Sequence, residues 1–462
     1  MDPDIRPALT RVEQIVRAIT QAITSGSMPP GSRLPSIRSQ AKSMGVSPFT
    51  VAEAYDRLAA NGLVASRRGA GVFVLVREQR QPRQTPALAD LPVDEHWLLR
   101  NIYRQPAQRI PAGCGWLPTD WYDEASQWRA IRAIGRDASL AAEYGDPLGF
   151  APLRQHLVRA LNERDIPAES GGVVLTQGAS SALSIAAAAI ARPGDTLLVD
   201  DPGYCNLLSS LSYQGFNIVG VPWNEQGPDT CALGELLTTC RPRAYFTNPW
   251  LQNPTGASYS THTAHEVLKL AERHDFLLVE DNVSGDLCPR PLPTLAALDG
   301  LERVIHIGSF SKSLSPGLRV GFFTARQELV DLMVRVKMMY GMTTPEINER
   351  ITLEMLRDGR QRRQLDRLRN RLAAAQFSCA EQFARIGWTL FTRPENGLFL
   401  LARPPHGQNS VELASRALQA GILLAPGSLF SPRREASSWL RFNVAYCDCA
   451  ALWTFLAQDQ AL

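Results

Sequence analysis

The sequence predicts a multidomain protein, with a small α+β domain at the N-terminus and a larger α/β domain after it. At 462 residues the chain exceeds the length of one ordinary hydrophobic core. Hydrophobic residues make up 45% of it and charged residues 20%, which is a globular composition. Residues 1–80 hold 11 Lys and Arg against six Asp and Glu, a net charge of +5, whereas the remainder is close to neutral. A basic module of this kind suggests a polyanionic partner.

The sequence gives no sign of a membrane or export signal. The N-terminal segment MDPDIRPALT carries acids and prolines where a signal peptide would have an apolar core. The longest small-apolar run, at 181–191, is too short to span a bilayer and is predicted to be a buried helix. The eight cysteines are scattered and include no CxxC pair of the metal-binding kind. We therefore expect a cytoplasmic protein with no metal site and no membrane partner.

Residues 10–76 are predicted to form three helices followed by a β-hairpin. Apolar side chains recur at helical spacing in the first helix, and two apolar strands flank an Arg-Arg-Gly turn. The third helix has the clearest start, because Ser47 can cap its free amides and Pro48 suits the first helical position. The predicted elements are helices at 10–26, 35–45 and 47–62 and strands at 63–66 and 72–76. Three helices and a hairpin in this order form a winged helix-turn-helix.

This domain carries residues suited to DNA at three points. The third helix starts with Ser47 and Thr50, small polar residues that can reach phosphates and base edges in a major groove. Arginines at the other two points suit phosphate contacts and entry into a minor groove. They are Arg33 and Arg38 beside the second helix and Arg67 and Arg68 at the hairpin turn. The alternative is a small helical domain that uses the same arginines to bind protein.

A family resemblance favours DNA. The segment from Pro29 to Val74 resembles the winged-helix domain of the GntR family nearly throughout. In that family, double-stranded operator DNA is the partner. The resemblance implies DNA contacts from Arg38, Ser47, Phe49, Thr50, Arg68 and Gly69.

The domain boundary falls where the hydrophobic periodicity fades. The stretch after residue 77 is rich in Pro, Gln and charge, a composition typical of an exposed linker. We predict a DNA-binding domain over residues 1–77, a linker over 78–110 and a large domain over 111–462.

In the large domain, short apolar strands alternate with helical segments. This alternation predicts an α/β domain built on a largely parallel sheet with both faces covered. In such sheets, ligands bind beyond the carboxyl ends of the strands. The seven predicted strands are 172–176, 196–200, 217–221, 244–248, 276–280, 303–309 and 321–325.

Lys312, in the loop SFSKSLSPGLRV, is the most informative polar residue near these strand ends. Only four of the 48 basic residues are lysines, and lysine can deprotonate and attack a carbonyl, which arginine cannot do. Tyr204 can stack on a planar ligand, Asn253 lies in a tight turn, and Asp281 follows an apolar strand. Taken singly, such residues are more often packing or capping residues than ligand contacts.

Taken together, the residues at the strand ends imply one ligand, pyridoxal 5′-phosphate (PLP). It has a phosphate, a flat ring, a ring oxygen, a basic ring nitrogen and a carbonyl that an amine can attack. The residues matched to these features are Gly178, Ala179, Ser180, Ser309, Ser311 and Arg319 for the phosphate, Tyr204 for the ring, Asn253 for the oxygen, Asp281 for the nitrogen and Lys312 for the carbonyl.

The order and spacing of these residues resemble the class I, fold-type I aminotransferases over about residues 110–455. The resemblance implies that Tyr144 reaches the cofactor phosphate of the partner subunit in a homodimer. It also implies that Arg441 holds the α-carboxylate of a substrate or effector, for which bidentate pairing suits arginine. One departure is that Val283 and Ser284 stand where relatives place a tyrosine after Asp281. We expect this change to weaken transaminase chemistry more than cofactor binding.

A GntR-type winged helix joined to an aminotransferase-like domain resembles the MocR subfamily of bacterial transcription regulators. We therefore predict a PLP-dependent, nucleoid-associated regulator that senses an amino compound, or PLP itself, through a Schiff base on Lys312. One alternative is an active aminotransferase that carries a DNA-binding arm. Another is a dimerisation scaffold with an empty site.

Overall fold

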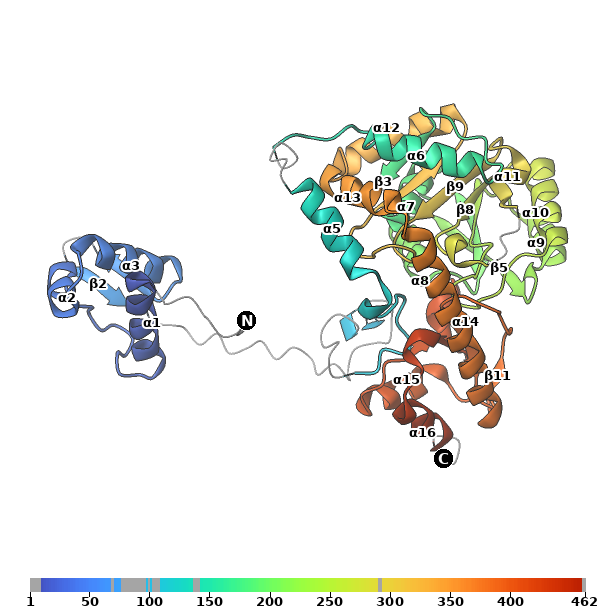
Figure 1. The fold of residues 1–462 in the computed structure, drawn as a ribbon. Helices are drawn as coiled ribbons and strands as arrows, with labels where there is room; N and C mark the ends of the chain where they lie inside the picture. Colours follow the sequence, from blue (N-terminus) through green and yellow to red (C-terminus); the bar gives the residue numbers. More distant parts are fainter. Residues whose placement is uncertain are drawn as a thin grey trace. The chain divides into compact units, whose positions relative to one another are not determined.

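The computed structural model describes residues 10–67, 70–75, 97–98, 100–101, 109–135, 142–289 and 293–458. The chain divides into two compact units, Met1–Leu91 and Pro92–Leu462, both drawn in Figure 1. Arg68, Gly69 and most of the predicted linker lie outside the described residues. Within the described ranges, no helix combines the length and the apolar character needed to cross a membrane.

The N-terminal unit has the three helices and the hairpin that the sequence predicts. The elements are α1 (Arg11–Thr24), α2 (Ile37–Met44), α3 (Pro48–Ala60), β1 (Val64–Arg67) and β2 (Gly71–Val74), with the two strands antiparallel. Ser47 caps α3, because its Oγ accepts the amide of Thr50 at 3.1 Å. Gly45 ends α2 with a φ of +63°, a conformation that favours glycine.

This unit has a hydrophobic core of its own. Ile15 and Ile19 of α1 pack with Val51 and Leu58 of α3, and Val64 of the hairpin closes the cluster. All five side chains are almost fully buried. The winged helix-turn-helix is therefore a packed domain and does not depend on the large unit for its core.

An eight-stranded mixed sheet lies at the centre of the large unit, in the order β3-β10-β9-β8-β7-β4-β5-β6. Its strands are β3 (Val173–Thr176), β4 (Thr196–Asp201), β5 (Asn217–Asn224), β6 (Gly227–Pro228), β7 (Ala244–Thr247), β8 (Leu277–Asp281), β9 (Val304–Ser309) and β10 (Gly321–Thr324). All seven predicted strands are confirmed. Strands β5, β4, β7, β8 and β9 run parallel, whereas β10 is antiparallel to both of its neighbours.

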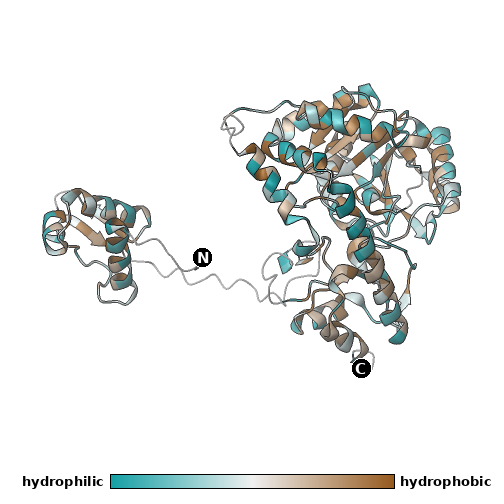
Figure 2. Cartoon of the chain, viewed as in Figure 1, coloured by the Kyte–Doolittle hydropathy of each residue, from teal (hydrophilic) through white to brown (hydrophobic). Residues whose placement is uncertain are grey.

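Helices cover both faces of this sheet (Figure 1). Consecutive strand residues enter opposite cores: Leu278 packs into one core and Val279 into the other. The first core is covered by α6 (Ala151–Asn162), α9 (Thr230–Thr239), α10 (Thr261–His274), α11 (Leu295–Asp299) and α13 (Glu346–Arg357). The second is covered by α7 (Ala179–Ile190), α8 (Cys205–Tyr213) and α12 (Gln327–Gly341). In Figure 2 the strands are coloured mostly hydrophobic, as a sheet buried on both faces requires.

A second, smaller sheet follows near the C-terminus and was not predicted. It is antiparallel, in the order β11-β12-β14-β13. Its strands are β11 (Thr389–Leu390), β12 (Phe399–Arg403), β13 (Ala425–Pro426) and β14 (Leu440–Asn443). The helices of this region are α14 (Gln361–Arg385), α15 (Ser410–Gln419) and α16 (Ala450–Gln458), and α5 (Glu124–Ile134) packs on α13. This smaller sheet matters for function because β14 carries Arg441.

Candidate functional site

A cleft of about 1370 Å³ lies at the carboxyl ends of the strands of the large sheet. Its wall gathers residues from both sheets and from the segment before α5. Among the residues predicted to hold a cofactor or its ligand, those that line this cleft are Ala179, Ser180, Tyr204, Asn253, Asp281, Ser309, Ser311, Lys312, Arg319 and Arg441. The fold thus brings together polar residues that lie far apart in the sequence.

Lys312 lies between β9 and β10 with its amine inside the cleft. Its Nζ donates to the carbonyl of Gly115, which comes from the segment before α5. Burial lowers the pKa of the Lys312 amine to about 8, and the positive charge of Arg441 acts in the same direction. A lysine with such a pKa is neutral, and so nucleophilic, far more often at neutral pH than an exposed lysine.

Asp281 ends β8 and lines the cleft. Its Oδ1 accepts the amide of Val283 at 3.1 Å, and its backbone carbonyl accepts Nδ2 of Asn248 at 2.6 Å. Burial raises the pKa of the carboxyl group to about 6. A buried carboxylate with a raised pKa is stabilised by a cationic partner, so this position suits the protonated nitrogen of a ring.

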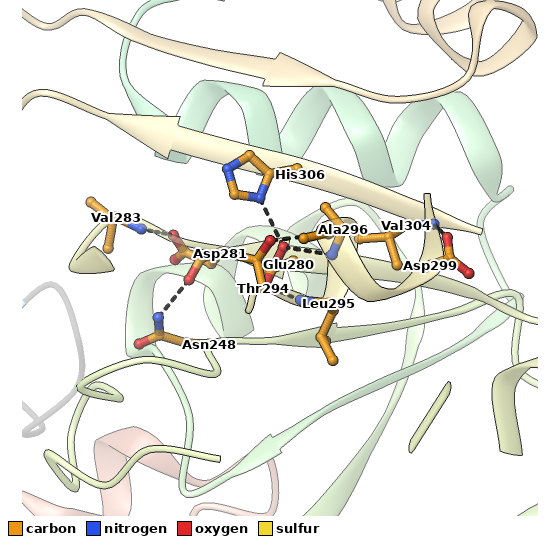
Figure 3. Close-up of polar contacts among 11 residues, drawn as sticks. Asn248, Glu280, Asp281, Val283, Thr294, Leu295, Ala296, Asp299, Val304 and His306 are labelled. Carbon is orange, nitrogen blue, oxygen red and sulfur yellow. Dashed lines mark hydrogen bonds and ion pairs between the residues drawn. The ribbon is translucent and has the colours of Figure 1, made fainter. Parts of the chain in front are cut away.

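The neighbouring residue, Glu280, fixes the same strand from the opposite face. Its carboxylate lies 2.8 Å from Nδ1 of His306 and accepts the amides of Leu295 and Ala296 at 2.9 and 3.3 Å (Figure 3). Both Glu280 and His306 are almost fully buried. These contacts join β8 to β9 and α11 and so hold the end of the strand that carries Asp281.

Arg441 and Asn253 meet at the far side of the cleft. Arg441 donates from Nη1 to Oδ1 of Asn253 at 2.9 Å and from Nη2 to the carbonyl of Gly113 at 2.6 Å. The rings of Phe399 and Phe430 lie 4.7 and 4.8 Å from the guanidinium carbon. Because the Asn253 oxygen accepts from Arg441, its amide nitrogen is the end that can donate to a ligand oxygen.

The Arg441 guanidinium still has a hydrogen-bond donor that an anion could use. Its Nε is buried and has no hydrogen-bond partner within the described ranges. No carboxylate among the described residues forms an ion pair with it. A buried, unpaired cation costs stability, so the arrangement fits a ligand that brings its own carboxylate.

The predicted phosphate-binding residues converge at the N-terminus of α7. They are Gly178, Ala179 and Ser180 at the start of the helix, Ser309 at the end of β9, and Ser311 and Arg319 from the loop after it. Arg319 donates to Oγ of Ser311 at 3.4 Å and to the carbonyl of Gln177 at 3.3 Å. A Cβ on Gly178, whose φ is +77°, would lie 2.7 Å from Nη2 of Arg319. Helix amides, hydroxyl groups and a guanidinium together suit a phosphate.

Tyr204 lies at the cleft wall directly before α8. Its hydroxyl accepts from Nδ2 of Asn206 at 3.1 Å and lies 3.5 Å from Oγ of Ser180. These contacts fix the ring near the phosphate-binding residues. Val283 and Ser284, at the positions where the family resemblance predicts a tyrosine, also line the cleft, and Ser284 is buried.

Sequence reasoning did not single out Asn248 or Tyr122. Asn248 donates its backbone amide to Asp200 at 2.9 Å and its Nδ2 to the carbonyl of Asp281 at 2.6 Å, so it links the ends of β4, β7 and β8. Its Oδ1 accepts the amide of Asn253 at 2.9 Å. It directly follows β7, and a search of every strand end for polar residues would have found it. Tyr122 donates to the carbonyl of Ser311 at 3.2 Å. It lies in an irregular segment, which no periodic pattern marks.

The predicted DNA-binding residues within the described ranges lie on the surface of the N-terminal unit, and all but the half-buried Thr50 are exposed. Phe49 is 77% exposed in the first turn of α3, next to the capping pair Ser47 and Thr50. Arg38 lies on α2, and Arg67 lies 5.1 Å from the ring centroid of Phe73 on the hairpin. The backbone of Arg33 forms an isolated antiparallel β-bridge with that of Phe73, so Arg33 is joined to the hairpin and not to α2.

The fold and the cleft are those of a PLP-binding protein, in which a lysine, an aspartate and an arginine face one ligand space. Comparison with known families agrees: residues 114–457 match the model described as aminotransferase class I and II. The chain belongs to this family, and PLP, its cofactor, is the one that the sequence predicts. Residues 11–74 match the bacterial regulatory proteins of the gntR family. The MocR-type arrangement of the two domains is therefore confirmed.

Individual relatives fall into two groups. The 2-aminoadipate transaminase of Thermus thermophilus is 31% identical over 71% of this chain and 82% of its own length. The HTH-type transcriptional regulator TauR of Rhodobacter capsulatus is 28% identical over 94% of this chain and 92% of its own. A crystal structure of the α-aminoadipate aminotransferase LysN from Thermus thermophilus, complexed with N-(5′-phosphopyridoxyl)-L-leucine, superposes with a TM-score of 0.70 at 26% identity. It covers 78% of this chain and 92% of LysN.

Proposed function

We propose that this protein is a PLP-dependent transcription regulator that binds DNA through its N-terminal unit and senses an amino compound in the cleft of its large unit. One observation carries the proposal. The same chain joins an exposed, capped α3 with arginines around it to a cleft in which Lys312, Asp281 and Arg441 face one space. Its relative TauR, which matches over both units, is named a transcriptional regulator, whereas the transaminase covers the large unit.

Each cleft residue has a role toward the cofactor. Lys312 would hold the carbonyl carbon, and the residues at the N-terminus of α7 would bind the phosphate together with Arg319; these residues, Gly178 apart, line the cleft. Asp281 holds a proton on the ring nitrogen, and Asn253 donates to the ring oxygen. When bound, PLP supplies an electron-withdrawing ring that makes its carbonyl carbon reactive toward amines. The DNA contacts are those of Arg33, Arg38, Ser47, Phe49, Thr50 and Arg67, with Arg68 and Gly69 beside them in the sequence.

The effector is an amine that also carries a carboxylate. Its amine would compete with the Lys312 amine for the cofactor, and its carboxylate would pair with Arg441, whose Nε has no partner among the described residues. An effector changes DNA affinity only if it binds one arrangement of the protein better than the other. A change in what the half-buried Lys312 amine contacts would be the local event that makes this difference.

The working form is a homodimer in the bacterial cytoplasm, bound to the nucleoid. Two-fold symmetry is the default for such folds and matches a palindromic operator. Tyr144 is 81% exposed and does not line the cleft of its own chain, which supports a contact with the cofactor phosphate of the partner subunit.

The second candidate function is that of an active aminotransferase with a DNA-binding arm. The complete set of Lys312, Asp281 and Arg441 favours it, and so does the 31% identity to a transaminase. The residues at 283 and 284 count against it, because neither supplies a phenol to the cleft.

A visible-absorbance titration followed by DNA binding tests both candidates. The purified protein is titrated with PLP and then with a panel of amino acids, and Lys312→Ala serves as the control that cannot attach the cofactor. For a regulator, one amino acid changes the absorption band and the DNA affinity together, without release of a keto acid. Turnover of that amino acid with a keto acid, together with a DNA affinity that is the same with and without PLP and amino acid, would establish the aminotransferase instead.

A further inference from the structure

Two buried charged residues lie beneath the loop that carries Tyr144. Lys337 of α12 is 4% exposed and Glu349 of α13 is 2% exposed. Lys337 is one of only four lysines in a chain that otherwise uses arginine as its cation. Charged groups at such depth destabilise a fold unless they are paired and hydrogen-bonded, so their partners indicate what they do.

Both side chains bind the backbone of one loop. The amine of Lys337 donates to the carbonyl of Pro147. The carboxylate of Glu349 accepts the amide of Phe150 at 2.8 Å through Oε2, and its Oε1 accepts the hydroxyl of Thr344. Charge-assisted bonds of this kind are the stronger hydrogen bonds of proteins. The two residues therefore hold the loop at its middle, at Pro147, and at its C-terminal end, at Phe150.

The rest of the loop is fixed just as closely. Asp146 accepts the amide of Leu148 at 2.7 Å, and the carbonyl of Leu148 accepts the amide of Leu175 in β3 at 2.9 Å. Gly149 has a φ of +94°, and a Cβ there would lie 2.6 Å from the Leu175 side chain. The segment 145–150 is thus bound to the sheet on one side and to α12 and α13 on the other.

Exposed large side chains lie both on this loop and on the segment that begins at Lys337. Tyr144 is 81% exposed, and exposed apolar residues also follow Lys337 along the chain. They are Met338, Met339, Tyr340, Met342 and Ile347. Exposed tyrosine and methionine side chains on the loop and on the segment that holds it are typical of a subunit interface, where such residues are enriched.

We propose that Lys337 and Glu349 are positioning residues: they fix the loop so that Tyr144 of one subunit completes the phosphate site of the other. This inference rests on the proposed function, which supplies the cofactor and the second subunit. A loop that is already fixed in the position that contacts the phosphate loses less conformational entropy when the cofactor binds than a free loop does. The cofactor therefore binds more tightly to the protein with the fixed loop.

The first test measures the PLP affinity of homodimers by visible absorbance. Lys337→Met removes the donor to Pro147, and we expect PLP to bind about tenfold more weakly, as for the loss of one hydrogen bond to a charged group. Lys269→Met is the matched control, since Lys269 is exposed on α10 and pairs with Glu266. The double variant Lys337→Met/Glu349→Gln leaves no unpaired charge in the core. It keeps the test informative if the single variant does not fold.

The decisive test uses mixed dimers that differ only in which subunit carries each change. In the first, one subunit has Lys312→Ala and the other has Lys337→Met. The subunit that keeps Lys312 then receives Tyr144 from a partner whose Lys337, and so whose loop, is intact. In the second, one subunit has both changes and its partner has none. The subunit that keeps Lys312 then receives Tyr144 from a partner whose loop has lost Lys337. We expect the first mixed dimer to bind PLP like the wild-type protein and the second to bind about tenfold more weakly.

A general loss of stability cannot produce this difference, because both mixed dimers contain the same set of substitutions. Equal affinity in the two mixed dimers, or weaker binding in the first, would overturn the inference. So would wild-type affinity in the Lys337→Met homodimer. If the wild-type protein itself fails to bind PLP, the proposed function is wrong, and that result is distinct from a failure of the positioning role.

Discussion

At the scale of single residues, the pKa of Lys312 makes a prediction about pH. Burial lowers this pKa to about 8, and only the neutral amine attacks a carbonyl. The neutral fraction is then roughly one tenth at pH 7 and nearly complete at pH 9. We therefore expect the rate of PLP attachment to rise about tenfold between pH 7 and pH 9 and then to level off. Stopped-flow absorbance over this range measures it.

An ordinary lysine would give a different profile. With a pKa near its usual value of about 10.4, the rate would keep rising beyond pH 10. Such a rise would show that the Lys312 amine is not desolvated in the protein in solution. The reaction of free PLP with a model amine at each pH corrects for the ionisation of the cofactor itself.

Arg441 gives the second prediction at this scale. Arg441→Gln should leave PLP attached, because the phosphate and Lys312 are bound elsewhere in the cleft. Affinity for amino acids should fall by about 1.5–3 kcal/mol, the value of a hydrogen bond to a charged group. Amines that lack a carboxylate should bind as before. Parallel titrations with an effector amino acid and its decarboxylated amine measure the difference, and Arg403→Gln, an exposed change on β12, is the control.

If Arg441→Gln weakens the amino acid and its decarboxylated amine equally, Arg441 supports the cleft and does not read the carboxylate. The hydrogen bond from Arg441 to Asn253 makes this outcome informative, since a displaced Asn253 would affect both ligands.

At the scale of elements, the start of α7 depends on Gly178. Its φ of +77° and ψ of 171° belong to a region that residues with a Cβ avoid. Gly178→Ala should destabilise the protein by about 1–3 kcal/mol through this strain. It should also weaken PLP binding, because the new Cβ displaces Arg319 from Ser311. Thermal melting with and without PLP measures both effects.

Gly234→Ala is a suitable control for Gly178→Ala. Gly234 lies within α9, its Cβ would meet open space, and alanine favours a helix more than glycine does. We expect no loss of stability there. Equal melting curves for the two variants would contradict the strain at Gly178.

The second prediction for an element concerns α2. Arg38→Ala removes an exposed cation expected to contact a DNA phosphate, so it should weaken binding to all sequences alike. The slope of the logarithm of affinity against the logarithm of salt concentration should fall by about 0.9. Arg57→Ala, on α3 but paired with Glu53 at 2.8 Å, should leave the slope unchanged. Fluorescence anisotropy at several salt concentrations distinguishes them.

The elements differ in how far the sequence could predict them. The strands of the large sheet were predictable because sheets covered on both faces need apolar runs, as at 276–279, directly before Glu280 and Asp281. The smaller sheet was not predicted, because β11 and β13 have only two residues each and carry no periodic pattern. Lys312 and Asp281 were predictable from their residue types at strand ends. The bond from Lys312 to Gly115 joins positions 197 residues apart, and no local pattern marks it.

At the scale of the whole molecule, the two compact units should melt separately. The N-terminal unit has its own core, in which Ile15, Val51 and Leu58 are almost fully buried. A ligand stabilises only the folded unit that binds it. The free energy of unfolding of that unit rises by about 2.7 kcal/mol when the ligand concentration is a hundred times the dissociation constant. PLP should therefore raise the melting temperature of the large unit alone, and operator DNA that of the N-terminal unit. Differential scanning calorimetry of the full chain resolves the two transitions.

The same experiment indicates how the two units communicate. If PLP moves only one transition, an effector must act through the arrangement of the subunits and not through the stability of the DNA-binding unit. The Lys312→Ala variant should then lose the PLP shift and keep the DNA shift unchanged. If PLP shifts both transitions, or if the chain melts in a single step, the units are coupled in stability. In that case the signal can pass directly from the cleft to the DNA-binding unit.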